Sequence, residues 1–183
     1  IFDGSLVQQN PLLAVTIVEN HDTQPLQSLE SPVEGWFKPL AYALILLRRE
    51  GYPCIFYADY YGANYKDKGK DGNEHEIFID SQKFLLDKFL YTRRCYAYGE
   101  QYDYFDHGNC VGWTRQGDDS HQGGIAVLLS NGEAGSKNMQ ARPKQTYIDI
   151  TEHIKESVTT NDEGWAEFRC KAGSVSVWVP KES

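Results

Sequence analysis

Residues 12–22, with the sequence LLAVTIVENHD, decide how the first half of this 183-residue chain is expected to fold. The opening run, residues 12–18, is short, continuously apolar and rich in β-branched side chains. Such a run is typical of a strand buried on both faces, as in a parallel sheet covered by helices. The strand is expected to end at Val18, because charged and polar residues begin at Glu19.

A helix is predicted after the polar loop that follows. Ser31 can cap its N-terminus, Pro32 suits the first helical position, and Glu34 stands where a capping box places its acid. The helix is expected to run to about Glu50. A kink is expected near Pro39, because proline lacks the N–H group that an interior helical position donates.

A second strand and helix follow. Residues 54–57 (CIFY) are predicted as a buried strand, residues 59–80 as a long polar loop, and residues 81–98 as a helix closed by Gly99. The order strand, helix, strand, helix predicts βα units with a parallel sheet. Two such units leave bare strand edges and an uncovered apolar helix face. The first half is therefore expected to be part of something larger.

After Gly99 the pattern changes to short, alternating or β-rich runs separated by turn signals such as Asn131-Gly132. This half is predicted to form an antiparallel sandwich or barrel. The fold class is thus α/β followed by all-β, with the domain boundary near Gly99. The expected strands are residues 102–105, 110–114, 124–130, 146–150, 164–170 and 174–179.

Composition narrows the classes of partner. The formal net charge of −8 argues against a nucleic-acid partner, since phosphate binding needs clustered Lys and Arg. No stretch approaches the ~20 apolar residues of a membrane helix, so no membrane partner is expected. The widely scattered cysteines lack the paired close spacing of a zinc site, and a domain of this size does not need disulfides. Free buried thiols in a reducing compartment are therefore favoured. They are Cys54, Cys95, Cys110 and Cys170.

Asn20, His21 and Asp22 directly follow the first predicted strand. In α/β barrels and open α/β sheets, ligand chemistry gathers at the carboxyl ends of the strands. A carboxylate beside an imidazole at that end can stabilise developing positive charge and bind hydroxyl groups. The competing interpretation is turn chemistry, with the aspartate capping backbone N–H groups. Spacing alone leaves both interpretations open.

The segment around this triplet, residues 14–25 (AVTIVENHDTQP), resembles the fourth conserved sequence region of the α-amylase family, glycoside hydrolase family 13. The resemblance covers essentially the whole chain, in order, and points to the bacterial subfamily of liquefying and intracellular α-amylases. The motifs are specific together rather than singly. The others are residues 36–43 (WFKPLAYA), 51–62 (GYPCIFYADYYG), 102–115 (YDYFDHGNCVGWTR) and 173–179 (GSVSVWV).

The resemblance implies an architecture. The two predicted strands of the first half would be strands seven and eight of a (β/α)₈ barrel. Residues 1–99 would then be the C-terminal part of the catalytic barrel, and residues 100–183 the antiparallel Greek-key β-sandwich called domain C. The missing barrel strands would lie in an N-terminal part of the same enzyme, which is the expected protein partner.

The resemblance also implies residue roles. Asp22 matches the third catalytic carboxylate, which binds hydroxyl groups of the sugar at the cleavage point and favours the oxocarbenium-like transition state. His21 matches a histidine that hydrogen-bonds the same sugar, and Asn20 is expected to bind substrate beside it. Tyr60 and Tyr61 are candidate sugar contacts, with packing of the barrel mouth as the alternative.

A retaining glycosidase also needs a nucleophile and a general acid. The resemblance implies that both lie upstream of Ile1, so the chain alone is expected to be inactive. Asp59 is expected either to shape the rim of the cleft or to stabilise a turn.

Calcium is the cofactor that the resemblance implies for the complete enzyme, at a site built from upstream residues. Some relatives hold a further calcium at positions that match Gly108, Asn109 and Asn131, with carboxylates at the last two. Calcium prefers charged oxygen ligands, so these asparagines make that site weak or absent. No metal held wholly by this chain is expected.

The implied activity is endo-hydrolysis of α-1,4-glucosidic bonds in starch, glycogen or their oligosaccharides, with retention at the anomeric carbon. One alternative is a non-catalytic carbohydrate-binding module with an exposed platform of Trp113, Trp165 or Trp178, although core burial is favoured for these residues. A second alternative is a transferase of the same family. The cysteines and the intracellular resemblance favour a cytoplasmic location, with secretion as the alternative.

Overall fold

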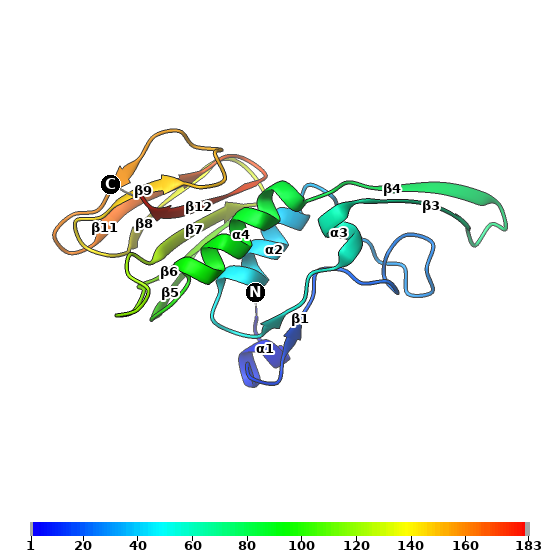
Figure 1. Cartoon of the computed structure of the whole chain (residues 1–183), viewed down its shortest axis with the longest axis horizontal. Helices are drawn as coiled ribbons and strands as arrows, with labels where there is room; N and C mark the ends of the chain where they lie inside the picture. Colours follow the sequence, from blue (N-terminus) through cyan, green and yellow to red (C-terminus); the bar gives the residue numbers. More distant parts are fainter. Residues whose placement is uncertain (1, 182–183) are drawn as a thin grey trace. The chain divides into compact units, whose positions relative to one another are not determined.

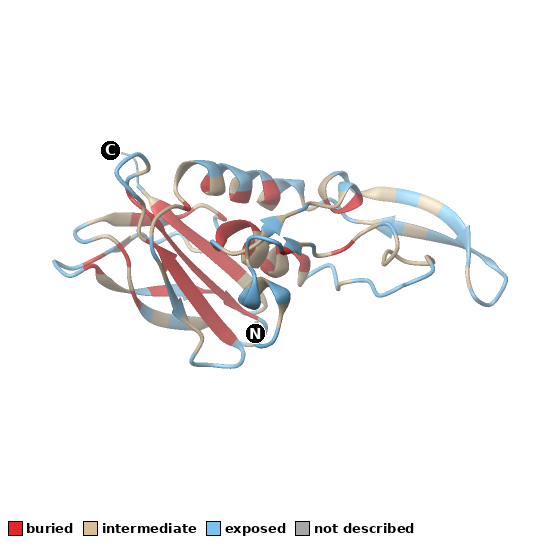
Figure 2. Ribbon diagram, turned by 90° about the horizontal axis from the view of Figure 1, so that it is seen from below, coloured by how far each residue is buried: buried red, intermediate tan, exposed pale blue. Residues whose placement is uncertain are grey.

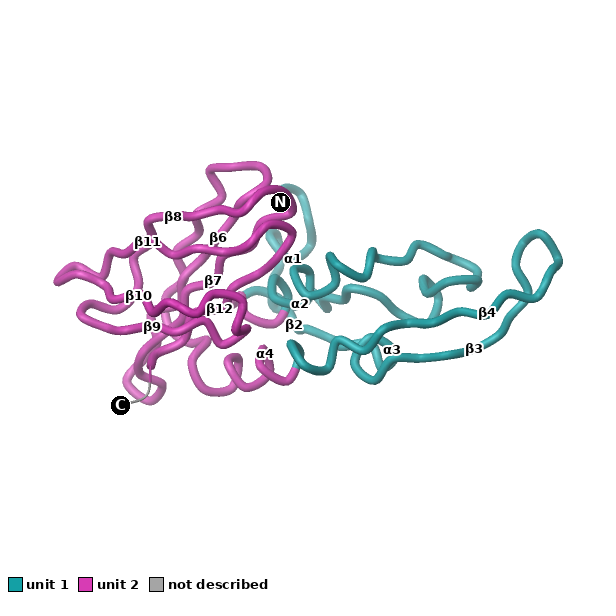
Figure 3. Tube along the Cα trace, turned by 90° about the horizontal axis from the view of Figure 1, so that it is seen from above, with its two compact units in different colours: residues 1–45, 50–86 teal, residues 46–49, 87–183 magenta. Residues whose placement is uncertain are grey.

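The computed structural model describes residues 2–181. The chain divides into two compact units, coloured separately in Figure 3. The first unit holds the residues up to 45 together with 50–86, and the second holds 46–49 together with the residues from 87 onward. Helices α2 (Lys38–Leu47) and α4 (Lys83–Cys95) therefore contribute residues to both units.

The first unit contains a short parallel strand pair (Figure 1). Strand β1 (Val15–Thr16) pairs with β2 (Tyr52–Pro53), and helix α1 (Leu6–Gln9) precedes it. A backbone hydrogen bond of 2.7 Å from the N–H of Tyr52 to the carbonyl of Ala14 extends the pair. The predicted parallel pairing is therefore present.

The length and burial of these strands differ from the prediction. The first apolar run is mostly exposed rather than buried on both faces, with Leu12 at 92% and Val15 at 66% exposure, although Ala14 is buried. The second strand precedes the predicted residues 54–57, and Tyr57 already begins a helix. Within residues 2–181, β1 and β2 pair only with each other. The apolar run stays exposed because no neighbouring strand extends the pair.

Helix α2 begins at Lys38, not at Ser31 as predicted. A turn precedes it, in which the carbonyl of Glu34 accepts from the N–H groups of Phe37 at 2.9 Å and Lys38 at 3.2 Å. Pro39 lies in the first helical turn, where a missing N–H leaves no helical bond unmade, so the reason for the expected kink is removed. The buried residues of the helix include Leu40, Tyr42, Ala43, Leu46 and Leu47.

Regular structure replaces the long polar loop expected after the second strand. A short helix, α3 (Tyr57–Tyr61), leads into an antiparallel hairpin of β3 (Ala63–Lys68) and β4 (Glu74–Ile79). Most of this hairpin is exposed (Figure 2). Opposite charges face each other across the ladder, as with Lys66 and Glu76, and stabilise it. Polar residues on both faces hid the period-two pattern that predicts a strand.

The second unit is built on antiparallel sheets. A six-stranded sheet has the order β10-β9-β12-β7-β6-β5, and β8 pairs with β11 in a separate sheet. The six predicted strands are present, whereas β8 and β10 were not predicted. The bounds are β5 (Gln101–Tyr104), β6 (Cys110–Arg115), β7 (Ile125–Ser130), β8 (Gly135–Gln140), β9 (Thr146–Asp149), β10 (Val158–Thr159), β11 (Trp165–Cys170) and β12 (Ser174–Pro180).

The core of the second unit is formed by side chains from both sheets, as in a β-sandwich. Every residue of β6 and β7 is buried, which Figure 2 shows as continuous red strands. The other face of the large sheet is covered in part by residues 46–49, where the indole N–H of Trp113 donates to the carbonyl of Leu47 at 3.4 Å. The core residues are Cys110, Ala126, Leu128, Met139, Ala141, Tyr147, Phe168, Cys170 and Trp178.

The cysteines are free, as predicted. Cys110 and Cys170 are buried in the sandwich core, but Cys54 is exposed and Cys95 is partly exposed, so the expectation of buried thiols holds for only one pair. No helix in the described part of the chain is long and apolar enough to cross a membrane.

Candidate functional site

The turn after β1 carries three of the predicted site residues. The side-chain oxygen of Asn20 accepts from the backbone N–H groups of Asp22 at 3.0 Å and Thr23 at 2.9 Å. In return, the hydroxyl of Thr23 accepts from the N–H of Asn20 at 3.1 Å. This is an Asx turn closed in both directions. Asn20 therefore does the capping that the turn interpretation had assigned to Asp22.

The side chains of His21 and Asp22 reach solvent beside one another. Their exposures are 80% and 48%, and the Nε2 atom of His21 lies 3.5 Å from the Oδ1 atom of Asp22. An accessible carboxylate next to an imidazole can bind hydroxyl groups or face a developing positive charge.

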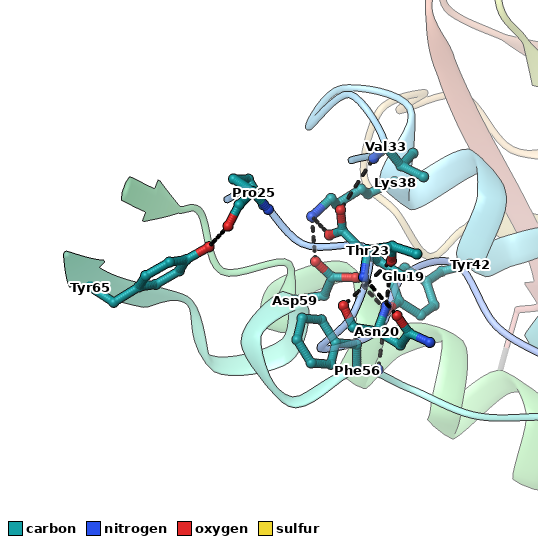
Figure 4. Close-up of polar contacts among 10 residues, drawn as sticks. All are labelled: Glu19, Asn20, Thr23, Pro25, Val33, Lys38, Tyr42, Phe56, Asp59 and Tyr65. Carbon is teal, nitrogen blue, oxygen red and sulfur yellow. Dashed lines mark hydrogen bonds and ion pairs between the residues drawn. The ribbon is translucent and has the colours of Figure 1, made fainter. Parts of the chain in front are cut away.

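A buried charged network lies next to this turn in the sequence (Figure 4). The ammonium of Lys38 lies 2.5 Å from the Oε2 atom of Glu19 and 2.5 Å from the Oδ1 atom of Asp59. The phenol of Tyr42 donates to the other oxygen of Asp59 at 2.6 Å and accepts from the N–H of Phe56 at 3.3 Å. Buried charges are tolerated when they are paired and hydrogen-bonded in this way.

The electrostatics of the network favour a protonated lysine and a protonated phenol. Burial lowers the pKa of Lys38, but the hydrogen bonds and charges of Asp59 and Glu19 outweigh this effect and leave the pKa raised. Burial and the hydrogen bond to Asp59 raise the pKa of Tyr42 far above its usual value. One ammonium thus lies between two carboxyl groups at neutral pH.

Tyr60 and Tyr61 lie together on α3, directly after Asp59. Their ring centroids are 4.7 Å apart in an edge arrangement. The phenol of Tyr60 accepts from the ammonium of Lys83 at 3.0 Å, and that ammonium also lies 4.8 Å from the ring centroid. Tyr61 is exposed and packs against Tyr57 with centroids 4.7 Å apart. Exposed tyrosine rings offer both an apolar face and a polar tip to a sugar.

The structure thus groups the predicted residues in two places, the turn of Asn20, His21 and Asp22 and the helix of Tyr60 and Tyr61. The buried network joins the two groups, since Glu19 precedes the turn and Asp59 precedes the tyrosines. Sequence reasoning missed Glu19, Lys38 and Tyr42. A usable signal was present, because Lys38 is a charged residue inside an otherwise apolar segment, and such residues are seldom buried unless paired.

Asn109 and Asn131, the positions considered for a further calcium, meet in the second unit, where the N–H of Asn131 donates to the carbonyl of Asn109 at 3.0 Å. Among residues 2–181, no group of three or more His, Cys, Asp or Glu side chains is arranged to hold a metal ion. Whether a metal binds within this chain stays a prediction.

The comparisons with known proteins agree with the family resemblance that the sequence motifs carry. No protein-family model matches the chain. A cytoplasmic alpha-amylase of Escherichia coli K12 is 48% identical over 185 residues, which cover 100% of this chain and 37% of that protein. An alpha-amylase of Geobacillus stearothermophilus is 46% identical over 187 residues, which cover 100% of this chain and 32% of that protein. The chain spans about a third of the length of these curated relatives.

Solved structures with a similar fold include CldA, a cyclomaltodextrin glucanotransferase with a three-domain ABC distribution. The TM-score is 0.63 at 22% identity, over 93% of this chain and 37% of that chain. At this identity the likeness concerns the fold alone. The sequence matches go further: over its whole length, the chain is similar to the C-terminal part of α-amylases of glycoside hydrolase family 13.

Proposed function

We propose that the chain is the C-terminal part of an α-amylase that hydrolyses internal α-1,4-glucosidic bonds of starch, glycogen and their oligosaccharides with retention. The observation that carries this proposal is the identity of 46% and 48% to two α-amylases across the entire chain. The partly exposed carboxylate of Asp22 at the carboxyl end of β1 supports it, because ligand chemistry gathers at that end of the strands in α/β folds.

In this proposal Asp22 binds sugar hydroxyl groups and stabilises the oxocarbenium-like transition state. His21 hydrogen-bonds the same sugar, Asn20 holds the turn and borders the substrate, and Tyr60 and Tyr61 contact neighbouring sugar rings. A retaining glycosidase also needs a nucleophile and a general acid flanking the scissile bond. Both belong to the N-terminal part of the enzyme, as does the main calcium site, so the chain alone has no turnover.

The proposed architecture assigns β1 and β2 to strands seven and eight of a (β/α)₈ barrel, with residues 1–99 in the barrel and residues 100–183 in domain C. The exposure of Leu12, Val15 and Tyr52 supports this assignment, because neighbouring barrel strands and helices would cover such apolar side chains. The partner that covers them is the N-terminal part of the same enzyme. A cytoplasmic location is part of the proposal, on the likeness to the Escherichia coli protein.

Substitution of Asp22 tests the proposal in the complete enzyme. We expect Asp22→Asn to lower kcat about 100- to 1,000-fold, as for removal of one preorganised electrostatic stabiliser. Asp119→Asn, which changes an exposed aspartate of the second unit, is the matched control and should leave kcat unchanged. Unchanged kcat in Asp22→Asn, or turnover by the isolated chain verified by intact mass, would contradict the proposal.

Two competing functions are less well supported. A carbohydrate-binding module with a tryptophan platform is disfavoured by the complete burial of Trp113 and Trp178. Trp165, the third candidate, is partly buried, and its ring packs edge-on against Tyr104 with centroids 6.4 Å apart. A transferase shares the fold, as the likeness to a glucanotransferase illustrates, but the relatives at 46% and 48% identity are α-amylases. Product analysis separates the two reactions, because a transferase forms new glucosidic bonds where a hydrolase releases reducing ends.

A further inference from the structure

The buried network of the first unit links two segments that the proposed function brings to the same substrate. We propose that Lys38 is a positioning residue, which fixes the turn of Asp22 relative to helix α3 and thereby sets the geometry of the sugar-binding site. The inference rests on the proposed function, since it concerns the placement of residues that this function assigns to substrate.

The first step of the argument is the completeness of the network. Each carboxylate oxygen in it has a donor: Glu19 accepts from Lys38 and from the N–H of Val33 at 3.3 Å, and Asp59 accepts from Lys38 and Tyr42. All four side chains that form it are buried. Such a network has few alternative arrangements, because any displaced member would leave a buried charge unpaired.

The second step is the connection from the network to the turn. Glu19 directly precedes Asn20, whose side chain and backbone bind Asp22 and Thr23 in the closed Asx turn. Holding the carboxylate of Glu19 therefore holds the start of a rigid turn. The position of the Asp22 backbone, from which the carboxylate projects, follows from that anchor.

The third step is the connection from the network to α3. Asp59 lies in the first turn of this helix, and its backbone carbonyl also accepts from the N–H of Gln82 at 2.7 Å. Tyr60 and Tyr61 follow it in the same helix. The ammonium of Lys38 thus bonds both to Glu19, which precedes the turn of Asp22, and to Asp59, which precedes the two tyrosines. Misplacement of a substrate-facing group by about 1 Å can cost on the order of 100-fold in rate.

The test compares two variants of α2 in the complete enzyme. Lys38→Met removes the ammonium with little change in side-chain volume, and kcat/KM for a maltooligosaccharide should fall about 100-fold. Leu40→Ala, which creates a cavity in the same helix, is the matched control. Both variants are assayed below their unfolding transitions, where Leu40→Ala should stay within about twofold of the parent enzyme. Lys38→Arg keeps the charge with a different donor geometry and should rescue part of the loss.

The two arms of the network provide a second readout that general destabilisation would not give. Glu19→Gln should act mainly on kcat, because it releases the turn of the transition-state stabiliser. Asp59→Asn should act mainly on KM, because it releases the helix of the candidate sugar contacts. These milder variants decide the question if Lys38→Met does not fold.

Three results would overturn the proposal: kcat and KM unchanged in folded Lys38→Met, equal losses in Lys38→Met and Leu40→Ala, or no difference between the two carboxamide variants. Failure of the proposed function looks different. In that case Asp22→Asn itself leaves turnover intact, whatever the Lys38 variants do.

Discussion

The two units of this chain use similar apolar side chains with opposite results. In the sandwich unit, valine and tryptophan side chains on β12 are fully buried. In the first unit, Val15 on β1 and Trp36 before α2 are exposed, although Val15 lies in an apolar run typical of a buried strand. The difference is explained by neighbours: the sandwich has both of its sheets within the chain, whereas the strand pair β1–β2 has no further strand among residues 2–181.

This contrast separates what burial within the chain can stabilise from what needs another polypeptide segment. The sandwich closes its own core, and its stability should respond strongly to core substitutions. The apolar surface of β1 and β2 contributes little to the stability of this chain, because it is not removed from water. This surface contributes to stability only when a partner covers it.

The largest expected effect comes from removing a tryptophan of the sandwich core. Trp178 packs against Phe168 with ring centroids 5.8 Å apart, and its indole N–H donates to the carbonyl of Arg169 at 3.2 Å. We expect Trp178→Ala to lower the free energy of unfolding of the 183-residue chain by ~3–5 kcal/mol. Urea denaturation followed by far-UV circular dichroism measures this loss.

The matched substitution in the first unit is Trp36→Ala. Because Trp36 is half exposed and packs edge-on against Phe37 with centroids 5.4 Å apart, the free energy of unfolding should fall by only ~1 kcal/mol. Similar losses for the two tryptophans would contradict the contrast between the units.

The sequence predicted the sandwich well, and the reason is visible in β6, β7 and β12. These strands are short, β-rich and bounded by turns, and their burial is supplied within the chain, so local pattern and tertiary structure agree. The hairpin β3–β4 was missed because charge pairs dominate its outer half, and its apolar face is limited to Ala63, Tyr65, Ile77 and Ile79 near the base. The start of α2 was misjudged because a plausible capping box at Ser31 did not form, and the helix begins at Lys38 instead.

The candidate site could be predicted only in part. The triplet Asn20, His21 and Asp22 stood out through its position after an apolar run. The roles of Asp22 and His21 came from the family resemblance and stay a proposal, whereas the structure adds that Asn20 caps the turn. The ion pairs of Lys38 join segments far apart in the sequence, and no local pattern specifies which carboxylates a buried lysine will meet.

A valine-to-threonine pair sharpens the contrast at smaller effect. In the sandwich, Val177 is buried, so Val177→Thr places a hydroxyl in the core and should cost ~1–3 kcal/mol of unfolding free energy. On β1, Val15 is exposed, and Val15→Thr should change the stability of the isolated chain by less than ~0.5 kcal/mol.

The same Val15→Thr change should weaken association with the N-terminal part of the enzyme, which isothermal titration calorimetry of the two parts measures. The proposed barrel buries this side chain, so the hydroxyl is desolvated only on association. Unchanged affinity would argue that β1 is not covered by that partner.

The smallest expected effect concerns the tip of the exposed hairpin. There the imidazole Nε2 of His75 lies 3.0 Å from the carboxylate of Asp71, and Asn73 donates to the same carboxylate. These hydrogen bonds, that of His75 first, lower the pKa of Asp71 to about 2. A lowered pKa in the folded state means that the interaction stabilises the hairpin above about pH 4, the usual aspartate pKa, and is lost as the pH falls through about 2.

Carboxyl titration by NMR tests this tip, with the pair of Asp118 and His121 in the sandwich unit as its counterpart. His75→Gln should move the pKa of Asp71 back toward its usual value while the midpoint of urea unfolding at neutral pH stays unchanged, because an exposed pair in water contributes little to stability.

The counterpart differs in one respect: His121 also stacks on Tyr98, with ring centroids 3.5 Å apart. Desolvation raises the pKa of Asp118, but hydrogen bonds from the backbone and imidazole of His121 and from the backbone of Ser120 leave it lowered. His121→Gln removes the imidazole and keeps the backbone bond, so it should lower the unfolding midpoint and raise the pKa of Asp118 only in part. Equal responses at the two sites would mean that the hairpin tip is as well packed as the sandwich, and that the contrast between the units does not extend to their surfaces.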